Sequence, residues 1–80
     1  MSFNNAKLVS TTYTGNTTIP EERGREYFLI QPTTADLTIQ FGSGSGAVTI
    51  LNGSYYEPYI APSTEIVITT IGSFIVVTNT

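Results

Sequence analysis

The sequence predicts an all-β fold: a small antiparallel β-sandwich or barrel, jelly-roll-like, with about six to eight short strands and no significant helix. Short runs of β-branched and aromatic residues recur between turn signals that stand about every eight to twelve residues. No stretch shows the apolar period of about 3.6 residues that marks an amphipathic helix. Residues 36–41 instead alternate strictly between polar and apolar side chains, as a half-buried strand requires.

The clearest strands lie at residues 27–31 and 36–41. The first is a compact aromatic and aliphatic run, and Pro32 and the residues after it can turn the chain. We therefore expect two antiparallel strands that share one apolar face. The side chains expected to point into the core from the second strand are Leu37, Ile39 and Phe41. Those expected to face outward or toward a neighbour are Thr38 and Gln40.

The chain divides into an N-terminal arm, residues 1–6, and a single β domain, residues 7–80. The arm contains one aromatic residue, Phe3, among small polar residues that cannot form a core. Residues 7–13 alternate without a clear buried face, and residues 17–19 form a short strand that stops at Pro20.

The second half of the chain predicts four more strands. Glycines and serines at 42–46 follow a strand but precede another strand, residues 47–51, so they lack the helix that a phosphate-binding loop needs. Asn52 and Gly53 predict a hairpin turn into residues 54–59. Two nearly continuous apolar runs, expected to be buried on both faces or covered by a neighbour, close the chain. These runs are residues 65–69 and 73–78.

Composition excludes several functional classes. The 80 residues include no cysteine and no histidine, which removes disulfides, thiolate metal sites and the usual general base, so we expect no cofactor and no metal. Only three residues are basic and the net charge is −3, which argues against nucleic acid as a partner. Residues 1–20 contain no apolar run that resembles a signal peptide, and no apolar run in the sequence is close to the ~20 residues that a membrane span needs. We therefore expect no membrane partner.

The low charge indicates association with other protein. Charged residues make up 11% of the chain, against about 25% for an ordinary soluble domain, and polarity comes instead from fourteen threonines, seven serines and five asparagines. A small domain without covalent staples also gains stability from partners that bind the folded state. We expect a homo-oligomer, although an ordinary β domain with a hydroxyl-rich surface fits the same composition.

We expect no enzymatic activity. Residues 21–24 carry the only concentrated charge, and a solvated loop is favoured there over a site. None of the six carboxylates is paired in the sequence with a plausible nucleophile or base. They are Glu21, Glu22, Glu26, Asp36, Glu57 and Glu65.

One aromatic patch, interrupted by prolines, is the candidate interface. Tyrosine is enriched at protein interfaces because it offers a large area with a polar tip, and it also stacks on sugars. Packing or subunit contact is favoured over sugar binding. The candidate interface residues are Tyr55, Tyr56 and Tyr59, together with Phe3 of the arm.

The order of motifs from residue 25 onward follows a recognisable pattern. An arginine precedes an aliphatic run that ends at glutamine, then come a strand ending in Phe-Gly, a Gly/Ser loop, a Leu-x-Gly-x-x-Tyr hairpin, a proline and two closing strands. Its positions here are Arg25, Phe28 to Gln31, Phe41, Gly42, Leu51, Gly53, Tyr56, Pro62, and 66–77. The pattern resembles a loose group of small tailed-bacteriophage virion proteins of the capsid decoration or auxiliary type. Pro32 departs from it, because such proteins often have asparagine there.

The resemblance implies a non-enzymatic virion structural protein, most simply a capsid decoration or cement protein that binds the outer shell as an oligomer, with a trimer favoured. Its partner would be the major capsid protein or another virion protein, and it would be made in the host cytoplasm and reside on the capsid surface. The alternative is a tail- or fibre-associated module that recognises a host-surface glycan through the tyrosine patch. For the arm, Phe3 is the expected anchor if the protein attaches to a particle, and a chain start with no role is the equally favoured alternative.

Overall fold

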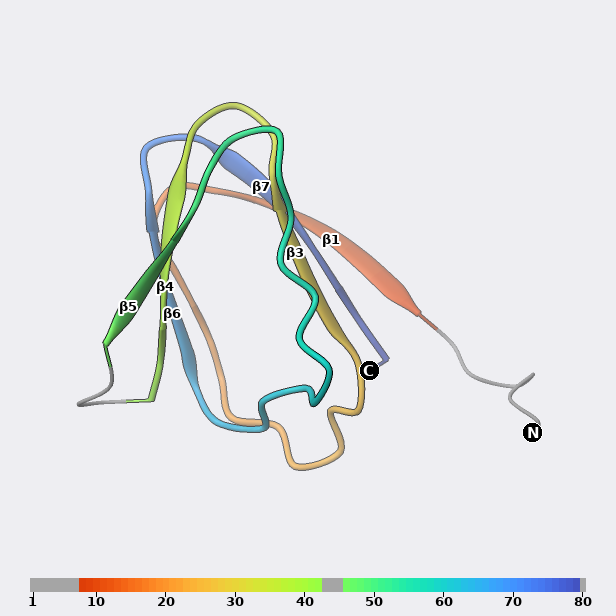
Figure 1. The fold of residues 1–80 in the computed structure, drawn as a ribbon. Coiled ribbons are helices and arrows are strands. Elements are labelled where there is room, and N and C mark those ends of the chain that lie inside the picture. The colour runs from red at the N-terminus through yellow and green to blue at the C-terminus, as the bar shows by residue number, and fades with distance from the viewer. Residues whose placement is uncertain (1–7, 43–45, 80) are drawn as a thin grey trace.

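The structure, a computed structural model, describes residues 8–42 and 46–79, which form seven strands and no helix (Figure 1). None of these residues builds a helix of the length and apolarity that crossing a membrane requires. The expected arm, residues 1–6 with Phe3, lies outside the described residues. The strands are β1 (Val9–Thr14), β2 (Thr17–Ile19), β3 (Phe28–Pro32), β4 (Leu37–Phe41), β5 (Ala47–Ile50), β6 (Ile66–Thr70) and β7 (Ser73–Thr78).

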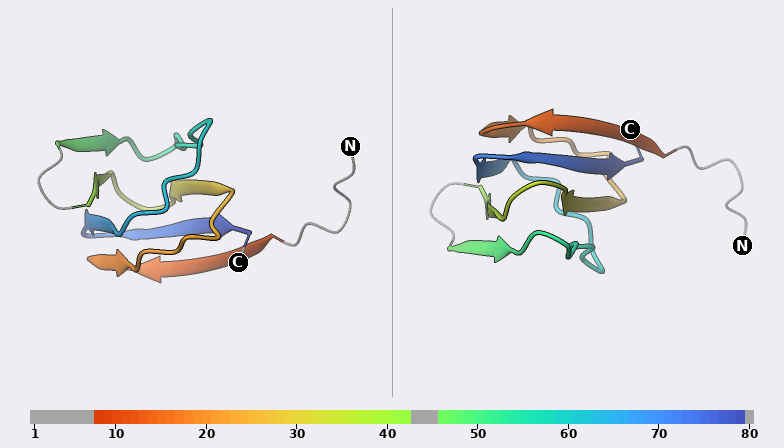
Figure 2. Two further views of the ribbon diagram at one scale, coloured as in Figure 1. Left: turned by 90° about the horizontal axis from the view of Figure 1, so that it is seen from below. Right: turned by 90° about the horizontal axis from the view of Figure 1, so that it is seen from above.

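The strands form two antiparallel sheets that face each other. One sheet has the order β1-β7-β3 and the other has the order β2-β6-β4-β5. Figure 2 shows the two layers, with β1 and β2 on one lateral side and β5 with the segment that follows it on the opposite side. The expected all-β class, without helix and with antiparallel sheets, is therefore confirmed. The sheets form an open sandwich rather than a closed barrel.

Alternate residues of the central strands build the core between the sheets. Because side chains on a strand alternate between faces, each strand directs every second apolar residue inward. Fully burying one such side chain contributes about 1.5–3 kcal/mol relative to leaving it exposed. The buried apolar cluster is Ile19, Phe28, Ile30, Leu37, Ile39, Ile50, Ile66, Ile68, Phe74 and Val76.

The face assignment predicted for β4 is confirmed at its first and third positions. Leu37 and Ile39 are fully buried in the core. Phe41 is only half-buried, because it lies at the end of β4 and packs on the margin of the core rather than inside it. Thr38 and Gln40 alternate with these residues and are half-buried on the outer face.

The expected pairing of the strand before Pro32 with the strand after it is wrong. β3 pairs with β7, whereas β4 lies in the other sheet between β6 and β5. The connection through Pro32 crosses from one sheet to the other, and the Thr33 amide donates to the Ser73 carbonyl at 2.9 Å. Alternation defines the buried face of a strand but does not identify its partner, which here comes from the far end of the chain.

The turn predicted at Asn52 and Gly53 is present, but the hairpin is not. Gly53 has a φ of 94°, and the Ser54 amide donates to the Leu51 carbonyl at 3.0 Å. Residues 54–59 do not return along β5; they cross to the other sheet, where Tyr56 bridges to Ile30 of β3. The turn therefore connects the two sheets at their edge.

The turn between β6 and β7 also joins the two sheets, and it needs glycine at position 72. A Cβ atom on Gly72 would overlap Thr34 Oγ1 and come within 2.8 Å of Ala35 Cβ. The near-continuous apolar runs on either side are each buried on one face only. Their alternate residues, such as Val67 and Ile75, are half-buried on the outer faces.

Candidate interface edge and tyrosine hollow

The lateral side formed by β5 and residues 51–60 exposes an unusual amount of apolar surface. Tyr59 is 101% exposed and Ile60 is 76% exposed, although large apolar side chains are normally covered. Exposed apolar side chains that gather on one side of a domain are typical of interaction sites, so this side is the candidate interface. We call this surface the tyrosine edge and define it as Val48, Leu51, Tyr55, Tyr59 and Ile60.

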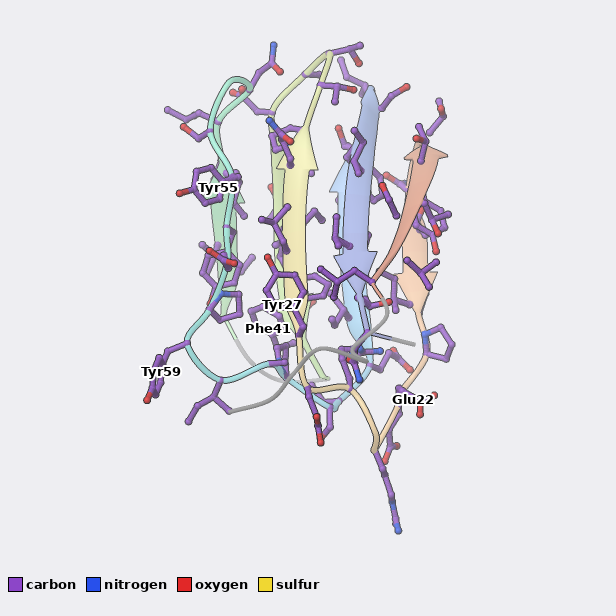
Figure 3. All side chains as sticks on the ribbon, turned by 90° about the vertical axis from the view of Figure 1, so that its right-hand side faces the viewer. Glu22, Tyr27, Phe41, Tyr55 and Tyr59 are labelled. Carbon is purple, nitrogen blue, oxygen red and sulfur yellow. The ribbon has the colours of Figure 1, made fainter. Side chains whose placement is uncertain are left out.

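Tyr56 fixes the segment that carries the edge. Its backbone exchanges two hydrogen bonds with Ile30, at 3.0 and 2.9 Å, and its ring lies 6.1 Å from the ring of Phe41. Because neighbouring side chains in an extended segment point to opposite sides, Tyr55 faces away from the core when Tyr56 faces toward it. Figure 3 shows Tyr55 and Tyr59 projecting outward from this segment.

A shallow hollow of about 380 Å³ lies beside the tyrosine edge, where the start of β3 meets the segment after Tyr56. Two of the residues that line it are joined by a hydrogen bond of 2.5 Å, which the Tyr27 hydroxyl donates to Glu57 Oε2. This bond to the carboxylate raises the pKa of Tyr27 above its ordinary value, and desolvation adds to the shift. The residues that line the hollow are Glu26, Tyr27, Glu57, Pro58 and Tyr59.

Asn79 holds the β3 side of the hollow in place. Its side-chain oxygen accepts hydrogen bonds from the Glu26 amide at 2.7 Å and the Tyr27 amide at 3.2 Å, and its side-chain nitrogen donates to the Gly24 carbonyl at 3.0 Å. The other side is held by the backbone pairing of Tyr56 with β3. Two segments far apart in sequence are thus fixed against each other. The hollow therefore requires little ordering when a ligand or partner binds.

Arg25 closes the same end of the sandwich from the inside. Its side chain is only 5% exposed, and it donates to the carbonyl oxygens of Pro62 at 2.7 Å, Thr64 at 3.2 Å and Pro20 at 2.8 Å. A guanidinium suits this position because its planar fork can serve several acceptors at once. It also lines a cavity of about 170 Å³ between the sheets, next to β1 and β2.

The structure brings together two of the four predicted interface residues. Tyr55 and Tyr59 are both exposed on the tyrosine edge, whereas half-buried Tyr56 packs against the core. Phe3 lies outside the described residues. Residues 21–24 are all exposed, as expected of a solvated loop.

Sequence reasoning missed the residues that complete the site. Tyr27 belongs to a predicted strand, and nothing in the sequence places it beside Glu57, thirty residues later. Arg25 directly follows a charged, exposed loop, so the neighbouring sequence gives no sign that its side chain is buried. Asn79 stands at the end of β7, where a polar residue usually marks only the end of a strand.

The described residues contain no group of three or more Asp, Glu, His or Cys side chains placed to hold a metal ion. The site therefore offers tyrosine rings, aliphatic side chains and two carboxylates, a combination suited to contact with protein or with hydroxyl-rich ligands. Comparisons with protein-family models, with curated proteins and with solved structures found no match to this chain.

Proposed function

We propose that this chain is a non-enzymatic structural protein of a tailed-phage particle, a decoration or cement protein that binds the outer shell as an oligomer. The observation that carries the proposal is the tyrosine edge, a set of exposed apolar side chains on a segment that Tyr56 joins to β3. Tyrosine in particular concentrates binding energy at interfaces because its large ring loses little conformational entropy on binding. The order of motifs from Arg25 onward is similar to that of small tailed-phage virion proteins, which is why we propose a phage particle.

We propose further that the two sheets form a jelly roll with eight strand positions. The strand orders support this assignment, because the segment at Tyr56 continues the first sheet as β1-β7-β3-Tyr56 beside β2-β6-β4-β5. Each sheet then has four strand positions. Every connection along the chain changes from one sheet to the other, except the β4–β5 loop. This arrangement matches two interleaved Greek keys. Jelly rolls of this kind occur in viral capsids and in lectins. The assignment therefore fits a role in the particle shell and a role in glycan recognition equally well.

The mechanism of attachment would be mechanical. The sandwich presents the tyrosine edge to a shell protein, and the aromatic and aliphatic side chains become covered without any large rearrangement. Charged residues are scarce on the whole chain, so few like charges oppose close approach. Several copies attached to one particle would convert a weak single contact into durable binding.

The test is whether purified particles of the phage that encodes the chain contain it, and whether the tyrosine edge holds it there. We expect mass spectrometry to find the wild-type chain in the particles and the Tyr59→Ser, Ile60→Ser double variant to be lost from them. Ile71→Ser is the matched control, because Ile71 is 96% exposed but lies in the β6–β7 turn, outside the tyrosine edge. Particles without the wild-type chain would refute the virion role, and retention of the double variant would exclude this edge as the contact.

The tyrosine hollow favours a second function, recognition of a host-surface glycan from a tail or fibre. Tyr59 offers a free ring for stacking, and Glu26 and Glu57 offer acceptors for sugar hydroxyls. Titration with fragments of host polysaccharide, followed by NMR, distinguishes this function from assembly. Saturable shifts at Tyr59 that Tyr59→Ala abolishes would support glycan binding, and their absence with every fragment would leave protein contact as the role of this surface.

A further inference from the structure

The outer edge of β1 is a second surface without a partner among the described residues. β1 pairs with β7 along its full six residues, and no described strand lies on its other side (Figure 2). Its side chains are almost all exposed, including Val9 at 39%. It carries no charge and no proline, the features with which proteins usually block an open edge.

The other sheet edges are better protected. The free side of β3 is bridged by Tyr56, and Pro58 follows two residues later. β2 is only three residues long and ends before Pro20, and β5 has four residues. Very short edge strands are themselves a protection against pairing. β1 is therefore the longest open edge in the described part of the chain.

The hydrogen-bond pattern identifies which backbone groups of β1 face this open side. The Gly15 amide donates to the Gly72 carbonyl at 2.9 Å, one step beyond the paired residues Thr14 and Ser73. Hydrogen-bonded pairs alternate along an antiparallel ladder. The odd-numbered residues of β1 therefore bond to β7, and the even-numbered residues point their N–H and C=O groups outward. Those residues are Ser10, Thr12 and Thr14.

The other side of β7 confirms this parity. The Thr33 amide donates to the Ser73 carbonyl, so the odd-numbered residues of β7 bond toward β3. Its even-numbered residues are then left to bond toward β1, where the register pairs them with odd-numbered residues such as Thr11 opposite Val76. Both sides of β7 give the same assignment.

We propose that β1 pairs antiparallel with β1 of a second copy of this chain, with Thr11 opposite Thr11 across the twofold axis. In this register, Ser10 of each copy lies opposite Thr12 of the other copy. Both residues point their N–H and C=O groups toward the open edge, so the two residues form a hydrogen-bonded pair. Val9 faces Tyr13, a branched–aromatic contact that covers exposed Val9. Without charge, the strand can meet its own copy without repulsion, as a self-complementary contact requires. The two β1-β7-β3 sheets become one continuous sheet.

The pairing concerns the lateral side opposite the tyrosine edge, so it does not rest on the proposed virion role. It predicts assembly in twos, rather than the trimer that the resemblance to decoration proteins implies. Residue pairs that face each other without hydrogen bonds have Cα atoms about 4.5 Å apart, within the range a disulfide spans. The chain has no cysteine, so a single introduced thiol reports directly on this geometry.

The experiment measures mass by sedimentation and cross-linking under mild oxidation. We expect wild type to reach the mass of two chains as its concentration rises, and Thr11→Cys to form a disulfide-linked pair. Thr12→Cys is the control, because position 12 faces position 10 of the other copy, and it should cross-link far more slowly. Thr12→Pro removes an N–H that points to the open edge and not to β7, so it should abolish the pair and keep the melting temperature close to wild type.

Three results would overturn the pairing. One is wild-type protein that stays a single chain up to millimolar concentration. Another is Thr12→Cys cross-linking as fast as Thr11→Cys, which would contradict the register. The third is an oligomer, of two or three chains, whose mass Thr12→Pro leaves unchanged. If Thr12→Pro fails to fold, the comparison of the two cysteine variants still decides the outcome.

Discussion

Replacing Arg25 with alanine tests how the sandwich is closed at the end where loop 20–25 meets residues 62–64. The guanidinium donates three hydrogen bonds to carbonyl oxygens of three separate residues. A hydrogen bond to a charged group contributes about 1.5–3 kcal/mol, so three independent bonds would sum to about 4.5–9 kcal/mol. The variant also removes a buried charge, whose desolvation costs several kcal/mol, and water from the adjacent cavity can reach the carbonyls. Because the carbonyls left behind are neutral, we expect a net loss of about 3 kcal/mol, the upper part of the usual range for a single substitution.

Urea denaturation of Arg25→Ala and Arg23→Ala measures this loss against a matched control. Arg23 lies two residues away and is exposed, so its removal changes the net charge equally and should alter the free energy of unfolding by no more than about 0.5 kcal/mol. Arg25→Lys should fall between the two, because an ammonium keeps the charge but cannot reproduce the planar fork. Equal denaturation midpoints for Arg25→Ala and Arg23→Ala, with unchanged slopes, would show that the buried guanidinium does not stabilise the fold.

Three further outcomes follow from packing and electrostatics. Gly72→Ala should destabilise the protein by about 1–3 kcal/mol because its new methyl group overlaps the β3–β4 connection, whereas Gly46→Ala meets nothing within 4 Å and should be neutral or slightly stabilising in the same thermal melts. Phe74→Ala should cost about 3–5 kcal/mol, since its ring is fully buried and stacks on a neighbour, and a loss below about 1 kcal/mol in urea would contradict the core assignment. Glu57→Gln should lower the pKa of Tyr27 toward the ordinary value by removing the carboxylate charge, as followed by tyrosinate absorbance or NMR. An unchanged Tyr27 titration in Glu57→Gln would contradict the hydrogen bond. Because folding raises the pKa of Tyr27, this residue stabilises the folded protein below pH about 10, and that stability is lost as the pH rises through the pKa of Tyr27 in the folded state.

The strands and their buried faces could be predicted because both depend on local alternation. Residues 17–19 and 73–78 have the predicted bounds, and Leu37 and Ile39 point inward as the period of two requires. Pairing could not be predicted in this way. Pro32 and Gly53 both supply the expected change of direction, but each sends the chain to the other sheet, because the partner that completes a buried layer lies far away in sequence.

The candidate site was predictable only where a single segment carries it. Tyr55 and Tyr59 stand in one proline-rich stretch, and its composition is enough to make it a candidate contact surface. Tyr27 meets Glu57 only because Tyr56 lies beside β3, so their hydrogen bond depends on topology. The burial of Arg25 depends likewise on carbonyls that are distant in sequence, which no local pattern contains.

The order of the strands has a consequence for how the chain is made. β7 is the central strand of its sheet and β6 is a central strand of the other, and both follow in sequence every strand with which they pair. During synthesis, β1, β2 and β3 therefore leave the ribosome before the strands that pair with them exist, whereas β4 and β5 can already pair with each other. Pairing Val9 with Thr78 closes nearly the whole chain into one loop, and such long-range contacts place folding in the slow range of about milliseconds to seconds. Until residues 66–78 are made, β1, β2 and β3 lack their partner strands, and the apolar faces of the earlier strands are not yet covered. In that interval the protein is most exposed to misassembly with its own copies.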